Sequence, residues 1–190
     1  QTRDAVHKLD ALMGQLRTRL SKLAQDINLV IVSDHGMAQV DPEQSIIVSS
    51  LPKDDNFIIV NTGPRLLIYT KSDAKNADID AYKARLQKAA KGRYSVLSRV
   101  GDIVVQTNAP AVFSNGTKAP YLGTHGYAYS DDMAATFVAA GPAFKKGVSI
   151  ELVNNLDIYP VLAKVMGLTL MSKVDSDGKT LMPAIKAVNH

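Results

Sequence analysis

The stretch Asn28–Met37, NLVIVSDHGM, constrains the fold more than any other part of the sequence. It opens with a continuous run of apolar, largely β-branched residues. Such a run is typical of a strand that is buried on both faces, as in the centre of a parallel sheet. Residues 28–33 are therefore predicted to form a buried strand. An aspartate and a histidine follow it directly, and Gly36 allows the chain to turn at that point.

Asp34 and His35 stand where ligands bind in open α/β sheets, outside the carboxyl ends of the strands. Carboxylate oxygen and imidazole nitrogen both suit a divalent metal such as zinc. The alternative is an aspartate that caps the next helix beside an exposed histidine, and the two residues alone leave both interpretations open. A catalytic relay with Ser33 is excluded, because consecutive residues of a strand point to opposite faces.

A second candidate ligand is His125, in the stretch Gly123–Tyr127. Glycines on both sides leave this histidine open to close approach by a ligand, although a glycine-flanked histidine by itself is a weak signal. It precedes a second apolar run, so it is predicted to lie at the same edge of the sheet as the Asp-His pair. The two stretches together favour a metal site. Asp131 and Asp132, which follow, are more typical of a loop or a helix cap than of a catalytic dyad.

The predicted core consists of elements near both ends of the chain. Apolar residues at spacings of three and four predict an amphipathic helix over 3–24 that packs on the sheet, with Thr2 as its N-cap. A second buried strand is predicted at 134–140. A helix follows at about 156–166, with Asn155 as N-cap and Gly167 just past its end.

Short strands and turn signals separate these core elements, and this pattern predicts an inserted α+β lobe. We predict a core formed by residues 1–40 and 122–190 and a lobe at 41–121. The elements predicted in the lobe are strands at 45–49, 57–60, 66–70, 94–98 and 103–106 and a helix at 76–91.

Composition excludes several classes of protein. The chain has no cysteine, so it has neither disulfides nor a thiolate metal site. Its 22 basic and 18 acidic residues are scattered, and no basic run is longer than Lys145-Lys146, which argues against binding specific to nucleic acid. No apolar run approaches the ~20 residues of a membrane span, so no transmembrane segment is expected.

The motifs VIVSDHGM, GTHGY, MAATFVAAGPAFKKG and NNLDIYPVLAKVMGL, in this order, resemble those of the nucleotide pyrophosphatase/phosphodiesterase family. This family belongs to the alkaline phosphatase superfamily. The resemblance runs through most of the chain and includes the helix that precedes the first motif. It implies an α/β fold, namely part of an alkaline-phosphatase-like three-layer α/β/α sandwich with a small inserted α+β lobe.

The resemblance also implies an activity. Family members hydrolyse phosphodiester or pyrophosphate bonds with two zinc ions and a threonine or serine nucleophile. Asp34 and His35 correspond to ligands of the nucleophile-side zinc, and His125 to a ligand of the water-side zinc. The implied partner is a phosphodiester or nucleotide substrate, and the implied location is periplasmic or extracellular.

The family's nucleophile and its remaining metal ligands would precede the first helix. We therefore expect this chain to be the C-terminal portion of a catalytic domain, with the N-terminal half as a required partner. Three of the six expected ligands remain, divided two and one, whereas a catalytic zinc usually has three protein ligands. We expect low zinc occupancy and little turnover from the chain alone. The alternatives are another hydrolase or a phosphomutase of the superfamily, or a non-catalytic binding module on the same scaffold.

Overall fold

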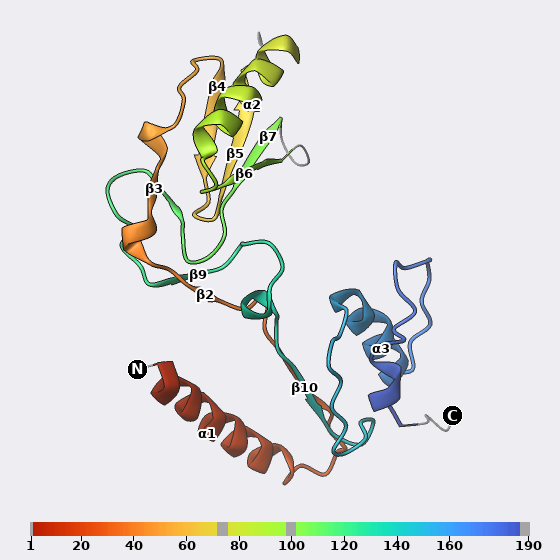
Figure 1. Ribbon diagram of the computed structural model, residues 1–190. Coiled ribbons are helices and arrows are strands. Elements are labelled where there is room, and N and C mark those ends of the chain that lie inside the picture. The colour runs from red at the N-terminus through yellow and green to blue at the C-terminus, as the bar shows by residue number, and fades with distance from the viewer. Residues whose placement is uncertain (1, 72–75, 98–101, 187–190) are drawn as a thin grey trace. The chain divides into compact units, whose positions relative to one another are not determined.

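The computed structural model describes residues 2–71, 76–97 and 102–186 (Figure 1). The chain forms two compact units. The first consists of Gln1–Val32 and Phe137–His190, and the second consists of Ser33–Thr136. The predicted inserted lobe, residues 41–121, falls inside the second unit, and the predicted division into core and lobe stays a prediction.

A two-stranded antiparallel ribbon forms the sheet of the first unit. Strand β1 (Leu29–Val32) pairs with β10 (Phe137–Ala140), so both predicted strands exist but are shorter than predicted. The prediction that they are buried on both faces is wrong. Val32 is 55% exposed and Val138 is 51% exposed. In the part of the chain that the structure describes, β1 pairs with β10 alone, and an apolar run is fully buried only where both faces of its sheet are covered.

Helix α1 (Thr2–Leu20) confirms the amphipathic prediction but not its packing. None of its residues is buried, and its apolar residues Val6 and Leu9 are exposed. The helix ends four residues before the predicted boundary, and Thr2 lies inside it instead of capping it. Spacing along the chain reports the apolar stripe of a helix, but it does not report which surface covers that stripe.

Helix α3 (Ile158–Val165) supplies the core of the first unit. Val161 packs with Phe144, Leu181 and Ile185, and one face of the ribbon contacts this cluster through Val30, Phe137 and Ala139. A 3-10 turn, Asn155–Asp157, precedes the helix, and its cap is Asn154 rather than the predicted Asn155. Gly167 follows the helix in the left-handed region, with a φ of 68°, as predicted for a residue just past a helix end.

A four-stranded antiparallel sheet dominates the second unit, and α2 (Asn76–Ala90) covers one face of it (Figure 1). The buried side chains Tyr82 and Leu86 of α2 pack on Leu66, Ile68 and Ile103 of the sheet. The predicted strands of this sheet are confirmed within a residue or so; Ser98, the last residue of one of them, lies outside the described residues. In sheet order the strands are β4 (Phe57–Asn61), β5 (Arg65–Thr70), β7 (Ile103–Gln106) and β6 (Ser95–Leu97).

Two short strand pairs complete the second unit. Strand β2 (Ala38–Gln39) pairs antiparallel with β9 (Gly123–Thr124). Strand β3 (Ile46–Ile47) pairs parallel with β8 (Phe113–Ser114). The strand predicted at 45–49 is thus only two residues long, and a 3-10 turn, Val48–Ser50, replaces the rest of it. Among the described residues, no helix has both the length and the apolar character needed to cross a membrane.

Candidate metal centre

The turn that carries Asp34 and His35 is held against the segment Asp131–Ala134. The backbone N–H of Gly36 donates to the carbonyl oxygen of Met133 at 3.1 Å. A Cβ atom at Gly36 would lie 2.1 Å from the backbone oxygen of Asp132, a distance that real Cβ contacts essentially never show. Only glycine therefore allows this close approach. Asp131 and Asp132 are the first two residues of a short 3-10 helix whose N-cap is Ser130, so neither of them is the cap.

The pairing of β2 with β9 brings His125 to His35. Ala38 is the register partner of Thr124, the residue before His125. The two imidazole rings are stacked, with centroids 3.6 Å apart and an angle of 15° between the ring planes. The structure thus brings together the two histidines that the sequence places about 90 residues apart. The approach of these residues is confirmed, whereas their role as metal ligands stays a prediction.

The contacts of His35 leave one of its ring nitrogens facing Asp34. Its Nδ1 atom lies 2.7 Å from the carbonyl oxygen of Gly36 and can only donate to it. In the corresponding tautomer, Nε2 carries the lone pair and lies 3.4 Å from Oδ2 of Asp34. The Asp34 side chain is 86% exposed, and its other oxygen accepts from the backbone N–H of His35 at 3.0 Å.

This arrangement fits a zinc ion. Two ligands of one tetrahedral zinc, at bond lengths of about 2.0–2.2 Å, lie roughly 3.3–3.6 Å apart, and the Nε2–Oδ2 distance falls inside this range. A ligating histidine almost always donates its other ring N–H to a carbonyl or a carboxylate, and the Gly36 carbonyl occupies that place. The sequence signals this partner only indirectly, through the glycine that permits the turn.

The described residues do not complete a metal site by themselves. Within residues 2–71, 76–97 and 102–186, no three side chains of His, Cys, Asp or Glu are grouped so that they could hold an ion. Asp34 and His35 therefore offer two donors, and His125 stacks on one of them. The division of the ligands between two ions, two on one and one on the other, stays a prediction.

The two tyrosines near His125, Tyr127 and Tyr129, differ in burial. Tyr127 is buried, and its hydroxyl donates to the carbonyl oxygen of Ala111 at 2.9 Å. Burial raises the pKa of Tyr127 to about 12. Tyr129 is exposed. Tyr127 thus anchors the loop that carries His125.

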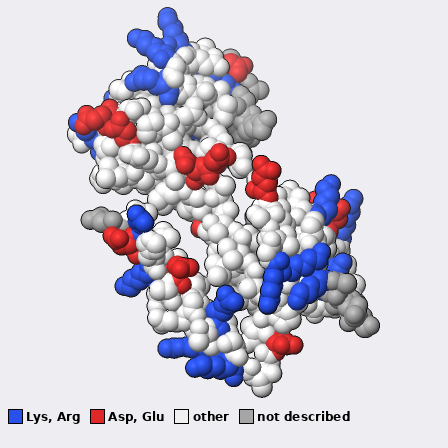
Figure 2. Space-filling model, turned by 60° about the horizontal axis from the view of Figure 1, so that its bottom comes forward, with Lys and Arg blue, Asp and Glu red and all other residues white. Residues whose placement is uncertain are grey.

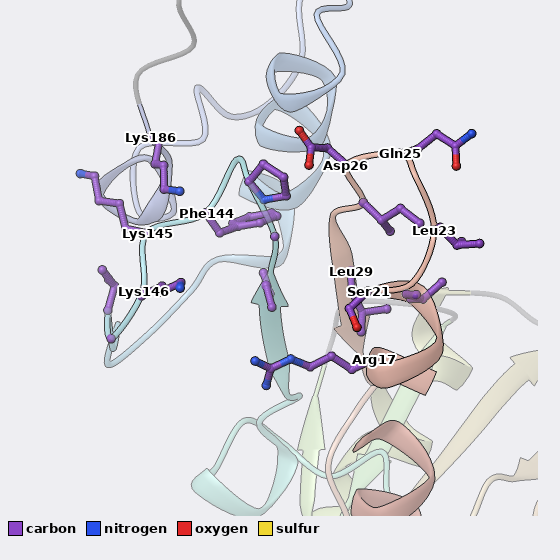
Figure 3. Close-up of a pocket in the computed structure, with 18 of the residues that line it drawn as sticks. Arg17, Ser21, Leu23, Gln25, Asp26, Leu29, Phe144, Lys145, Lys146 and Lys186 are labelled. Atoms are coloured by element: carbon purple, nitrogen blue, oxygen red, sulfur yellow. The ribbon is translucent and has the colours of Figure 1, made fainter. Parts of the chain in front are cut away.

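A cavity of about 710 Å³ lies in the first unit and contains none of the three predicted ligands. Residues from the end of α1 and from the segment after β10 line it. Figure 3 shows Lys145, Lys146 and Lys186 on one side of the cavity and Gln25 and Asp26 on the other. On the face seen in Figure 2, the basic side chains form several separate groups.

The family described as "Type I phosphodiesterase / nucleotide pyrophosphatase" matches residues 1–128. The chain belongs to this family. A bis(5'-adenosyl)-triphosphatase of Xenopus laevis is 29% identical over 173 residues, which are 85% of this chain and 38% of that protein. The human ectonucleotide pyrophosphatase/phosphodiesterase family member 5 is 29% identical over 192 residues, which are 87% of this chain and 38% of that protein.

Solved structures of this family confirm the fold. Human ectonucleotide pyrophosphatase/phosphodiesterase 5 superimposes with a TM-score of 0.78 at 26% identity, over 97% of this chain and 51% of that one. An inactive form of the murine protein in complex with AMP gives a TM-score of 0.77 at 24% identity, over 96% and 51%. The α/β, alkaline-phosphatase-like fold class predicted from the sequence is confirmed. This chain spans about half of the solved relatives and 38% of the curated ones above.

Proposed function

We propose that this chain is part of a zinc-dependent phosphodiesterase or nucleotide pyrophosphatase, with Asp34 and His35 on one zinc and His125 on a second. The observation that carries the proposal is the pair of contacts made by the two ring nitrogens of His35. Its Nδ1 is taken by the Gly36 carbonyl, and its Nε2 faces a carboxylate oxygen at the spacing of two ligands of one zinc. Membership of the family supports the same activity.

Each residue has a distinct part in this proposal. Asp34 supplies negative charge that offsets the charge of a cation, and His35 supplies a neutral nitrogen whose orientation the Gly36 carbonyl fixes. His125, stacked on His35, presents its ring at the same place. When bound, two zinc ions supply Lewis acidity, which stabilises charge on phosphorus and lowers the pKa of an attacking hydroxyl or water.

The proposed substrate is a nucleotide or another phosphodiester. An inactive form of the murine relative was solved in complex with AMP, and the relatives include bis(5'-adenosyl)-triphosphatases. We propose a periplasmic or extracellular location, which is in keeping with the name "ectonucleotide" of the relatives.

The nucleophile and the remaining ligands are proposed to come from the part of the family domain that these 190 residues do not span. Two donors at one position and one at another fall short of the three protein ligands of a usual catalytic zinc. The chain alone is therefore proposed to bind zinc weakly and to turn over negligibly.

Hydrolysis of a chromogenic phosphodiester with added zinc tests this proposal. We would compare the 190-residue chain with a longer protein that carries the full family domain. Turnover by the longer protein alone supports the proposal, and turnover by the short chain would show that its nucleophile lies inside these residues. Unchanged zinc content and turnover in the longer protein with His35→Ala would favour a non-catalytic role for the site.

A further inference from the structure

The turn between β4 and β5 packs against the loop that carries His125. Gly63, in this turn, has a φ of 87°, and a Cβ atom there would lie 3.2 Å from the hydroxyl of Tyr121. The Gly63 carbonyl accepts from the N–H of Phe113 at 2.8 Å, and the Pro64 carbonyl accepts from the N–H of Thr107 at 3.0 Å. The turn is therefore a fixed part of the second unit, and it lies beside the segment that leads to His125.

Arg65, the first residue of β5, extends this connection. Its Nε atom donates to Oε1 of Gln106 at 2.8 Å, and Gln106 is its register partner on β7. Its NH2 group donates to the backbone carbonyl oxygen of Tyr127 at 3.3 Å. Because the planar guanidinium fixes both donors in one plane, the sheet sets the direction in which the second bond points.

The hydrogen bond from Arg65 to the Tyr127 carbonyl affects His125 because Tyr127 follows two residues after it. Gly126 separates the two residues, adopts a φ of 95° and has no side chain to restrict it. The first fixed point after His125 is therefore Tyr127, whose ring is held by Ala111 and whose carbonyl is held by Arg65. On the other side of His125, Thr124 is held by its pairing with Ala38.

We propose that Arg65 is a positioning residue for the metal site: through the Tyr127 carbonyl, the α+β sheet fixes the His125 loop so that His125 stacks on His35. The geometric part of this inference stands on the contacts alone. Its consequence for metal binding rests on the proposed function.

Nuclear magnetic resonance of the histidine rings tests the geometric part. Stacked rings shift each other's proton resonances, so the ring protons of His35 and His125 should differ from those of the exposed His7 in α1. Arg65→Ala should move the resonances of both stacked rings toward that of His7. Arg65→Lys should give a smaller change of the same sign. An ammonium group can keep one of the two acceptors, but it cannot bridge both in the same plane.

Arg93→Ala is the matched control. Its NH2 group also donates to a backbone carbonyl at 3.3 Å, that of Ala89 in the same unit, but it makes this contact at the end of α2. The control should leave the stacked rings unchanged. A folded Arg65→Ala variant with wild-type His35 and His125 resonances overturns the inference. If Arg65→Ala does not fold, Gln106→Ala is the second variant, because it removes the other hydrogen-bond partner of the Arg65 guanidinium. It should shift the same resonances by less. Unchanged resonances in a folded Gln106→Ala variant would also overturn the inference.

A zinc titration separates this inference from the proposed function. If the site binds zinc, Arg65→Ala should weaken the affinity by about ten- to a hundredfold, as is usual for residues that support metal ligands. If the longer protein that carries the full family domain binds no zinc, the proposed function fails, while the ring resonances still decide the role of Arg65. Wild-type zinc affinity in Arg65→Ala would overturn the consequence proposed for metal binding.

Discussion

Substitution of Gly36 by alanine tests the geometry of the Asp-His turn. The new Cβ atom would lie 2.1 Å from the backbone oxygen of Asp132 and 2.8 Å from that of Ala134. The first distance is about 1.3 Å short of the 3.4 Å at which ordinary contact begins. Both neighbours are backbone atoms, so they cannot move away as a flexible side chain would. We expect a loss of roughly 1–3 kcal/mol in the free energy of unfolding of the second unit.

Urea unfolding followed by tyrosine fluorescence measures this loss, and Gly116→Ala in the same unit is the control. A Cβ atom at Gly116 meets nothing within 4 Å, so this change should lie within about 0.5 kcal/mol of the wild type. Zinc affinity should also fall in Gly36→Ala, because the Gly36 N–H and carbonyl hold the turn and the His35 ring. Equal unfolding midpoints for the two variants would refute the close packing of Gly36.

Two further predictions concern buried polar groups. Hydrogen bonds from Ser176 and Thr180 hold the pKa of the Asp157 carboxyl below its ordinary 3.8. The stability that this carboxylate gives the first unit is therefore complete above the ordinary pKa, and it is lost as the pH falls through the lowered pKa of the folded state. If Asp157→Asn unfolded in acid with the same pH dependence as the wild type, this prediction would be contradicted. Burial raises the pKa of Tyr127 to about 12, so its stabilising effect should persist below pH 10 and disappear between pH 10 and about 12. Tyr127→Phe should remove one phenol that titrates at high pH from the ultraviolet titration. It should also lower the free energy of unfolding by about 1 kcal/mol, since the Ala111 carbonyl loses its donor. An unchanged titration would count against the assignment of the raised pKa to Tyr127.

The parts of the fold that sequence could predict are those governed by local periodicity. Strand β7 was predicted to the residue, and α2 ends within one residue of its predicted boundary. The alternation of apolar residues in a strand and their spacing in a helix are properties of the segment itself. The exposed stripe of α1 and the half-buried β1 mark the limit of such patterns, because burial depends on what else lies against the element.

The candidate site was predictable in its residue types and in the approach of its two histidines, but not in the contacts that hold them together. Asp34, His35 and His125 are visible as chemistry-bearing residues in glycine-containing turns. Their approach depends on the pairing of β2 with β9, and each of these strands has only two residues, too few to leave a periodic signal. The Gly36 carbonyl and the Arg65 guanidinium were not predictable, because a backbone oxygen and a contact across 62 residues leave no local pattern.

Zinc binding by the 190-residue chain tests the central claim most directly. Calorimetric titration at neutral pH would compare the wild type with Asp34→Asn and His35→Ala, and His7→Ala is the control, because His7 is an exposed histidine in α1. The account predicts weak binding by the wild type and by His7→Ala, and loss of that binding in both site variants. Wild-type zinc affinity in folded His35→Ala would contradict the assignment of Asp34 and His35 to a metal site.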